Sequence, residues 1–266
     1  MNQELFNLGQ LPSRTTKPRE SGITMVMDKG LSLREAEDFV SNSLEYTDII
    51  KLGFGTGFVT PGLQRKIDLY KEAGLPVYFG GTLFEAYIIR NQFEDYLRLL
   101  DKTGITHAEV SDGSIEMHHD EKCEYIRKLA SRAVVLSEVG SKDAEKIIPP
   151  YEWIEQMESE ISAGVWKVIA EARESGNVGI YHRDGKAHTL LIDMIKSKVP
   201  LDKIMWEAPI KSQQVWFIKH FDQNVNLGNI APIDVIPLET LRIGLRGDTF
   251  FSFMPEEMKK EIKNFQ

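Results

Sequence analysis

The sequence has little cysteine: Cys123 is the only one among 266 residues. A single thiol excludes a disulfide framework and a cysteine-rich zinc site within one chain, and it fits a reducing compartment. Nowhere do about 18 apolar residues follow one another, and the first twenty residues lack the apolar core of a secretory signal. We therefore expect a cytoplasmic protein that does not cross a membrane.

Positive charge is also scarce, because the formal net charge is −8. A general binder of nucleic acid or of anionic membranes needs a basic surface that releases phosphate counterions, so we expect neither partner. An anionic small molecule would instead need positive charge concentrated at one place.

Several nucleotide and metal motifs are missing. No GxGxxG follows the first apolar segment and no GxxxxGK[ST] occurs, which disfavours an open doubly wound sheet, the alternative architecture. The HExxH motif is absent as well. Because His118 and His119 are adjacent, they cannot share one helix face, so a zinc site there is not expected.

What the sequence does have is a regular alternation of short β-branched runs and longer helical segments from Gly22 onward, typical of βαβ units. The predicted strands are 23–27, 48–52, 77–79, 107–110, 133–137, 166–170, 203–206 and 225–227. The predicted helices are 32–44, 62–73, 84–102, 119–130, 151–163, 188–197, 211–220 and 237–243. Eight units and this length predict an α/β fold of one domain, a (β/α)8 TIM barrel over residues 21–266, preceded by an irregular N-terminal arm over residues 1–20.

Local residues support these boundaries. Ser32 and Glu35 have the spacing of a capping box, and Gly74, Gly104 and Gly164 each follow a helical run. The sixth unit is ambiguous, since residues 178–181 could also form its strand. We prefer 166–170, which makes 172–187 a long loop after the strand.

In such barrels the chemistry lies on the loops that follow the strands. Glu109, Glu138, Glu171 and Glu207 stand at equivalent places on four consecutive strands. Carboxylate oxygens suit Mg²⁺, so these four are the candidate metal ligands. The alternative is that some of them pair with Lys29, Lys51 or Arg173 to hold the barrel mouth together.

Basic and glycine-rich segments at the same strand ends suggest an anion site. Lys142 lies on a loop of the predicted catalytic face, so we expect it to transfer a proton, whereas Lys51 suits a substrate contact and a structural ion pair equally. The GFGTG (53–57) and GGT (80–82) segments let backbone N–H groups approach a phosphate or carboxylate. The candidate substrate-binding residues are Lys29, Lys51, Arg173, Gly228 and Asn229.

Most of these candidate residues, though not Lys51, lie in or directly beside segments that resemble the phosphosulfolactate synthase family. The segments are MDKGL (27–31), GGTLFE (80–85), EVSDGS (109–114), SEVGSKD (137–143), ARESG (172–176), EAPIKSQQ (207–214), NLGNIA (226–231) and LETLRIGLRGDT (238–249). They occur in order over nearly the whole predicted domain.

The resemblance implies a TIM barrel that requires Mg²⁺ and adds sulfite to phosphoenolpyruvate, giving (2R)-O-phospho-3-sulfolactate, on a pathway to coenzyme M or to sulfolactate. It implies a lysine general acid, at Lys142 in this sequence. The first lysine of the family's EVGKK-type motif is replaced by Ser141. Glu138 and Glu171 would then hold the metal, and Arg173 with the Gly228–Asn229 backbone would hold the phosphate.

Two other functions stay open at this point. Lys142 or Lys51 could form a Schiff base in an aldolase-like barrel enzyme, or the chain could be a non-catalytic, stress-associated relative. The sequence also leaves the oligomeric state open, a homo-oligomer included.

Overall fold

Eight parallel strands form the centre of the protein. The computed structural model describes residues 3–141, 148–173 and 175–263. The strands are β1 (Thr24–Asp28), β2 (Ile49–Leu52), β3 (Val77–Phe79), β4 (His107–Val110), β5 (Val134–Val139), β6 (Lys167–Ala170), β7 (Ile204–Glu207) and β8 (Leu227–Ile230). They are hydrogen-bonded in the order β3-β2-β1-β8-β7-β6-β5-β4, and the end strands β3 and β4 are neighbours in space. The sheet is therefore a nearly closed barrel.

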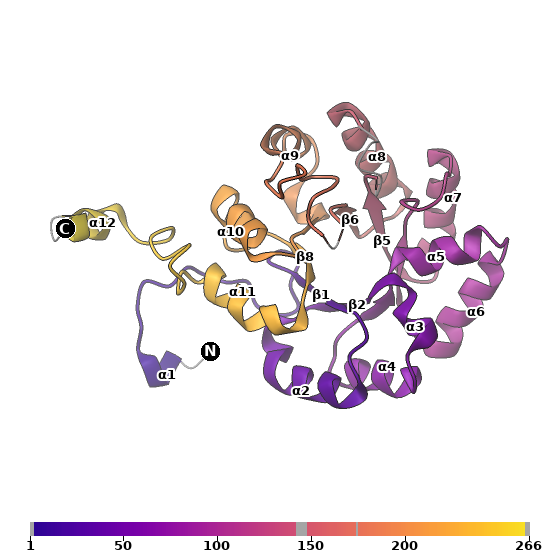
Figure 1. The fold of residues 1–266 in the computed structure, drawn as a ribbon, viewed down its shortest axis with the longest axis horizontal. Coiled ribbons are helices and arrows are strands. Elements are labelled where there is room, and N and C mark those ends of the chain that lie inside the picture. Colours follow the sequence, from indigo (N-terminus) through magenta and orange to yellow (C-terminus); the bar gives the residue numbers. More distant parts are fainter. Residues whose placement is uncertain (1–2, 142–147, 174, 264–266) are drawn as a thin grey trace.

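Helices surround the strands and connect them (Figure 1). They are α2 (Leu33–Ser43), α3 (Thr56–Val59), α4 (Leu63–Glu72), α5 (Gly81–Ile88), α6 (Phe93–Thr103), α7 (His119–Ala130), α8 (Pro150–Ala163), α9 (Thr189–Lys196), α10 (Lys211–His220) and α11 (Val235–Arg242). Within the described ranges, four 3-10 turns are η1 (Leu44–Tyr46), η2 (Gly53–Gly55), η3 (Leu201–Lys203) and η4 (Pro232–Asp234). The (β/α)8 TIM barrel is confirmed.

The predicted elements are confirmed with two exceptions. The eighth strand runs from 227 to 230 instead of 225 to 227. The Asn226 side chain accepts a hydrogen bond from the N–H of Ile23 and donates to the carbonyl of Ile204, so residues 225 and 226 lead into the strand. The single helix expected over 84–102 was wrong, because α5 and α6 are separated around Asn91, whose φ is 55°.

Local details agree with the remaining boundaries. Ser32 and Glu35 form the capping box, with the Ser32 N–H donating to Glu35 Oε2 at 2.8 Å. Gly164, with φ of 115°, ends α8. The sixth strand is β6, and residues 178–181 belong to the following loop, where Tyr181 forms an isolated bridge to Ala187.

The N-terminal arm lies against the amino-terminal end of the barrel. Arg14 joins it there, with Nε 2.9 Å from Glu239 Oε1 and NH1 3.0 Å from the carbonyl of Gln223. The arm begins with a short helix, α1 (Gln3–Phe6), that the sequence did not predict.

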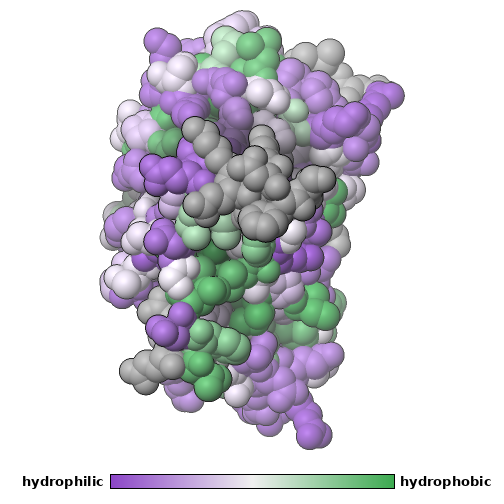
Figure 2. All heavy atoms as spheres, turned by 90° about the vertical axis from the view of Figure 1, so that its left-hand side faces the viewer, coloured by the Kyte–Doolittle hydropathy of each residue, from purple (hydrophilic) through white to green (hydrophobic). Residues whose placement is uncertain are grey.

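Both chain ends project from the same side of the barrel, α1 beside the N-terminus and α12 (Glu256–Lys263) beside the C-terminus (Figure 1). Figure 2 looks at that side and shows apolar side chains among the polar ones. Exposed large apolar residues in the end segments are Leu5, Phe6, Leu8, Phe250, Phe251 and Met258. Among the described residues, no helix combines the length and the apolar character needed to cross a membrane.

Two apolar cores support the strands. The larger core lies between the strands and the surrounding helices, and the smaller one fills the barrel. The smaller core consists of Ile23, Met25, Ile49, Tyr78, Leu136, Ile169 and Met205. Side chains two residues apart on a strand point to the same face. Two residues after Ile49, Leu136, Ile169 and Met205, the chain therefore places a charged residue on the inner face. These charged residues are Lys51, Glu138, Glu171 and Glu207.

Candidate active site

A cavity of about 460 Å³ opens at the carboxyl end of the strands, where a barrel carries its chemistry. We call it the barrel-mouth cavity. Its lining includes seven of the predicted site residues: Lys51, Glu109, Glu138, Glu171, Arg173, Glu207 and Asn229. The strand alternation explains much of the convergence, since four of these residues, Lys51, Glu138, Glu171 and Glu207, lie one inward-facing position beyond the apolar filling of the barrel.

Lys51 lies at the centre of the acidic residues. Its ammonium is 3.0 Å from Glu109 Oε2, 3.3 Å from Glu138 Oε2 and 3.6 Å from Glu207 Oε1, and the residue is 5% exposed. Burial alone would lower the pKa of Lys51, but the surrounding carboxylates raise it well above the usual value. The ion pair, one of the two roles that suited Lys51 in the sequence, is present in the structure, and the carboxylates favour the charged form of the ammonium.

Backbone N–H groups hold the second carboxylate oxygen of Glu109 and of Glu207. Glu109 Oε1 accepts from the N–H of Gly81 at 2.5 Å, and Glu207 Oε2 accepts from the N–H of Ala172 at 2.9 Å. The Gly81 position requires glycine, because a Cβ there would overlap the side chain of Ser111. The GGT segment thus directs an N–H group at a carboxylate of the protein itself.

Burial raises the pKa of both carboxyl groups. For Glu109, Lys51 opposes this shift and Glu138 adds to it. The pKa of Glu207 rises to about 7 for the same reasons in the same order. A carboxyl group with such a pKa exchanges a proton near neutral pH, which is common at functional sites.

Arg173 and Asn229 complete the side of the cavity formed by β6 and β8. Both have left-handed backbones, with φ of 51° and 57°. The Arg173 N–H donates to Glu171 Oε1 at 2.5 Å, which ties the start of the long loop to the end of β6. The amide oxygen Oδ1 of Asn229 is buried and accepts no hydrogen bond from the described residues.

Two predicted residues do not line the cavity, and a third is outside the described residues. Lys29 is exposed on the loop after β1 and does not line the barrel-mouth cavity. Gly228 lies inside β8, where a Cβ would be 2.6 Å from Met25 Cε, so its role in the structure is close packing. Lys142 lies outside the described residues, and the roles predicted for all three stay predictions.

The cavity offers oxygen donors for Mg²⁺, but the four glutamates predicted as ligands do not form one metal-binding group. Among the described residues, no group of three or more His, Cys, Asp or Glu side chains could hold a metal ion. Glu109, Glu138 and Glu207 face Lys51 instead. The buried Oδ1 of Asn229 and the carboxylates of Glu171 and Glu138 are oxygen donors, which suit Mg²⁺ when it keeps several waters.

Sequence reasoning missed the buried charges behind the cavity. Lys66 on α4 is 2.8 Å from Asp28 Oδ2, and Tyr70 donates to the same oxygen at 3.0 Å. Lys122 on α7 contacts Asp112 and Glu160. A signal existed, because Lys122 lies on the same helical stripe as the buried Ile126 and Leu129.

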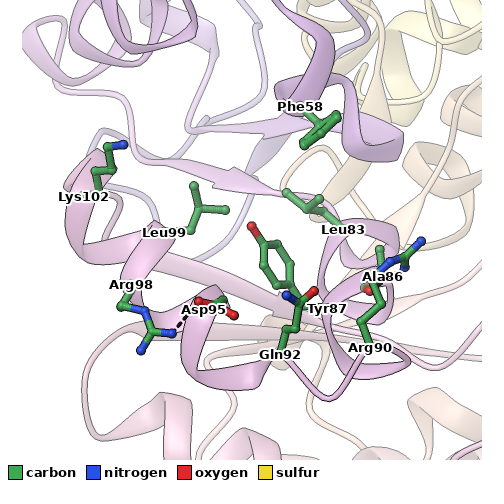
Figure 3. A pocket seen from close by; sticks show the side chains of 10 residues that line it. All are labelled: Phe58, Leu83, Ala86, Tyr87, Arg90, Gln92, Asp95, Arg98, Leu99 and Lys102. Atoms are coloured by element: carbon green, nitrogen blue, oxygen red, sulfur yellow. Dashed lines mark hydrogen bonds and ion pairs between the residues drawn. The ribbon is translucent and has the colours of Figure 1, made fainter.

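A larger cavity of about 650 Å³ lies outside the barrel, beside α3, α5 and α6. Figure 3 shows Phe58, Leu83, Tyr87 and Leu99 around it, with Arg98 joined to Asp95. Its lining contains none of the predicted site residues and lies away from the inner face of the strands, so the barrel-mouth cavity remains the candidate active site.

The fold and this charged cavity define the class as an α/β-barrel enzyme. A family model described as (2R)-phospho-3-sulfolactate synthase matches residues 12–248. Phosphosulfolactate synthase of Bacillus subtilis (strain 168) is 41% identical over 245 residues, covering 91% of this chain and 97% of that protein. Phosphosulfolactate synthase of Methanocaldococcus jannaschii is 40% identical over 237 residues, covering 87% and 94%. The chain belongs to the phosphosulfolactate synthase family.

Solved structures with low sequence identity share the barrel alone. A 3-hexulose-6-phosphate synthase superposes with a TM-score of 0.52 at 16% identity, covering 83% of this chain and 99% of that one. The 3-keto-L-gulonate-6-phosphate decarboxylase of Vibrio cholerae gives 0.53 at 14% identity, covering 88% and 100%. At these identities the likeness supports the fold and says nothing about the reaction.

Proposed function

We propose that this protein is a phosphosulfolactate synthase that adds sulfite to phosphoenolpyruvate, giving (2R)-O-phospho-3-sulfolactate. The observation that carries the proposal is the lysine-centred acidic cavity of a chain that is 41% identical to the Bacillus subtilis phosphosulfolactate synthase over 97% of its length. In this reaction the sulfur lone pair of sulfite forms a bond to C3 of phosphoenolpyruvate. The π electrons of the C2–C3 bond then accept a proton at C2.

Charge balance at the cavity supports a divalent cation. Among the described residues, four glutamates line it together with Lys51 and Arg173, so carboxylates are in excess there when ionised. Both substrates are anions, and they would be repelled unless that excess is neutralised. Glu138, Glu171 and Asn229 Oδ1 would hold Mg²⁺. The bound ion would supply a Lewis acid that stabilises the negative charge developing on the substrate carboxylate.

Residues of the chain have distinct roles in this proposal. Lys51 holds the carboxylates of Glu109 and Glu138 in place and adds positive charge beneath the substrate. Arg173 and the backbone of Gly228 and Asn229 bind the phosphate, and Lys29 meets the anions as they enter. Lys142 donates the proton to C2.

The Schiff-base alternative receives no support at Lys51. A lysine must lose its proton to attack a carbonyl, and the carboxylates around Lys51 raise its pKa. Borohydride reduction in the presence of pyruvate should leave the mass of the protein unchanged. A covalent adduct on Lys51 would favour the aldolase-like function.

The direct test is to incubate the purified protein with phosphoenolpyruvate, sulfite and Mg²⁺, and to follow phosphosulfolactate by mass spectrometry. We expect product with Mg²⁺ and none after chelation with EDTA. Absence of product from folded, Mg²⁺-supplied protein would refute the proposal. Product formation at the same rate after chelation would refute only the metal requirement.

The general acid is tested separately by Lys142→Ala. We expect kcat to fall by about 10²- to 10⁴-fold, the usual contribution of a positioned acid. Lys198→Ala, an exposed lysine between α9 and β7, is the matched control and should keep full activity. Unchanged turnover in Lys142→Ala would remove this residue as the acid.

Location and assembly stay predictions. We expect a cytoplasmic protein, and a homo-oligomer would give the exposed apolar side chains near both chain ends a surface to pack against. Light scattering on the purified chain measures the assembly.

A further inference from the structure

Lys122 brings three parts of the protein together behind the candidate active site. The residue lies on α7 and is 1% exposed. Its ammonium is 2.9 Å from Asp112 Oδ1, 2.9 Å from Glu160 Oε1 and 2.6 Å from the carbonyl oxygen of Glu138. These acceptors belong to the loop after β4, to α8 and to β5. We call Lys122, Asp112 and Glu160 the Lys122 cluster.

The contacts of the Lys122 cluster restrict the relative positions of the elements that they join. The ammonium donates hydrogen bonds to Asp112 and to the carbonyl of Glu138 and forms an ion pair with Glu160, and each of these residues lies on a different element. Glu160 is fully buried, so a displaced ammonium would leave this carboxylate without the cation that lies 2.9 Å from it. The loop after β4 and the end of β5 are therefore held at a fixed distance from α7 and α8.

Both segments held in this way line the barrel-mouth cavity. Glu138 offers its backbone oxygen to Lys122 and its carboxylate to Lys51, 3.3 Å away. Asp112 directly precedes Gly113 and Ser114, two lining residues. Glu85 holds the same loop from the other side, where its Oε2 accepts from the N–H of Ser114 at 2.8 Å. The Lys122 cluster thus fixes the positions of the loop after β4 and of the end of β5 at the cavity. None of the three residues of the cluster lines the cavity itself.

A second buried lysine shows what a purely structural role looks like. Lys167 on β6 is also 1% exposed, and its ammonium donates to the carbonyls of Glu20 at 2.9 Å and Asp202 at 2.6 Å. Those contacts lie at the amino end of the barrel, where they join the N-terminal arm to the turn before β7. The two lysines match in type and burial but differ in the end of the barrel that they hold.

We propose that Lys122 is a positioning residue of the active site, which sets the Glu138 carboxylate and the 112–114 loop at the distances that the reaction requires. Its ammonium acts through the backbone of Glu138 and the carboxylate of Asp112. This inference rests on the proposed sulfite addition for its kinetic consequence, although its structural consequence does not depend on it.

The kinetic test compares Lys122→Met with Lys167→Met in the sulfite-addition assay. Small misplacements of reacting groups cost about 10²-fold in rate, so we expect kcat of Lys122→Met to fall by that factor with KM for phosphoenolpyruvate changing far less. Lys167→Met should keep the wild-type kcat. Lys122→Arg keeps a buried cation with several donors and should recover most of the loss. Equal kcat values for the two methionine variants would overturn the proposal.

Asp112→Asn provides a milder variant in case Lys122→Met does not fold. The Asp112 side chain is 27% exposed, so its neutral form is tolerated, yet the ammonium loses its charged partner on the loop. We expect a loss of kcat of the same kind but smaller than that of Lys122→Met. A wild-type kcat in Asp112→Asn would overturn the proposal when Lys122→Met is insoluble.

Hydrogen exchange distinguishes this inference from the proposed function. Lys122→Met, or Asp112→Asn in its place, should speed amide exchange in residues 111–118 and 137–141, and Lys167→Met should not. If the wild-type protein does not add sulfite, the proposed function fails, and exchange alone decides the inference. Unchanged exchange in these two segments would then overturn it.

Discussion

The two ends of the barrel satisfy buried positive charge in different ways. At the carboxyl end, Lys51 and Lys122 lie against buried carboxylates. At the amino end, Lys167 and Arg242 donate mainly to backbone carbonyls, and the carboxylate nearest to Lys167 belongs to the 84%-exposed Glu20, 3.7 Å away. Lys51 and Lys122 therefore have charged acceptors, whereas those of Lys167 and Arg242 are mainly neutral, although Arg14 and Arg19 pair with Glu239 and Asp48 at the same amino end.

The pKa values follow this division. Burial disfavours all four charged forms, but carboxylates raise the pKa of Lys51 and of Lys122 above the usual value. Burial lowers the pKa of Lys167, with only partial opposition from Glu20. Burial and the nearby Arg14 lower the pKa of Arg242 to about 9.

This difference indicates at which end buried charge costs desolvation free energy that packing does not require. Carbonyl groups at a loop or strand end need donors in any case, so Lys167 and Arg242 complete the backbone hydrogen bonds. A buried set of three carboxylates around one ammonium is expensive to desolvate and is often no more stable than apolar side chains of the same volume. Because stability does not explain such a set, we infer that the carboxyl end keeps it for the reaction.

The largest effect should come from Lys51→Met. Loss of the ammonium leaves three carboxylates facing one another, so we expect the unfolding free energy to fall by about 3–5 kcal/mol. Activity should fall by about 10³-fold, because a preorganised charge is removed from the cavity. Urea unfolding and the sulfite-addition assay measure the two effects. A folded variant with wild-type activity would show that the charged set around Lys51 is not needed for the reaction.

A stability loss without a catalytic loss is expected from Arg242→Met. The guanidinium donates to the carbonyls of Gln223, Val225 and Ile23 at 2.7, 2.8 and 3.3 Å. Leaving these acceptors unsatisfied should lower the unfolding free energy by about 3 kcal/mol. The value of kcat/KM, measured well below the melting temperature, should stay at the wild-type level. A selective fall in kcat would show that the amino end also supports the reaction.

The two ends also differ in how far the sequence predicts them. Glu138, Glu171 and Glu207 could be placed at one edge because each follows an apolar residue at strand spacing, and parallel strands end together. Their orientation toward Lys51 could not be placed, since it depends on the barrel radius and on which inner positions face each other across it. The four predicted glutamates do line one cavity, whereas the role of Lys51 among them was left undecided by the sequence.

Contacts between helices and loops could be predicted less well from the sequence. Lys122 meets Asp112, Glu160 and the carbonyl of Glu138 only after α7, α8 and β5 pack together, and no local pattern carries that information. The break between α5 and α6 was missed for a local reason. Asn91 tolerates a left-handed backbone and can end a helix, but its polar neighbours also suit an uninterrupted exposed face.

The smallest effect concerns acid stability at the amino end. His107 begins β4, packs edge-on against Trp166 with ring centroids 6.2 Å apart, and has its pKa lowered to about 4 by burial. The unfolded chain takes up a proton on this imidazole below its ordinary value of 6.5, but the native protein does not until about pH 4. The contribution of His107 to stability is thus present above pH 6.5 and is lost as the pH falls toward 4. The slope is at most about 1.4 kcal/mol per pH unit for one proton.

We therefore expect His107→Gln to flatten the fall in unfolding free energy between pH 6.5 and 4, by less than the full slope because the ring is partly exposed. Glu207 at the other end has the opposite sign. Its pKa is raised to about 7, so it lowers stability as the pH rises from 4.5 to 7. Urea unfolding at several pH values, compared between the wild type and His107→Gln, isolates the imidazole. Parallel slopes would show that His107 is protonated in the native protein and that the amino end tolerates an added charge.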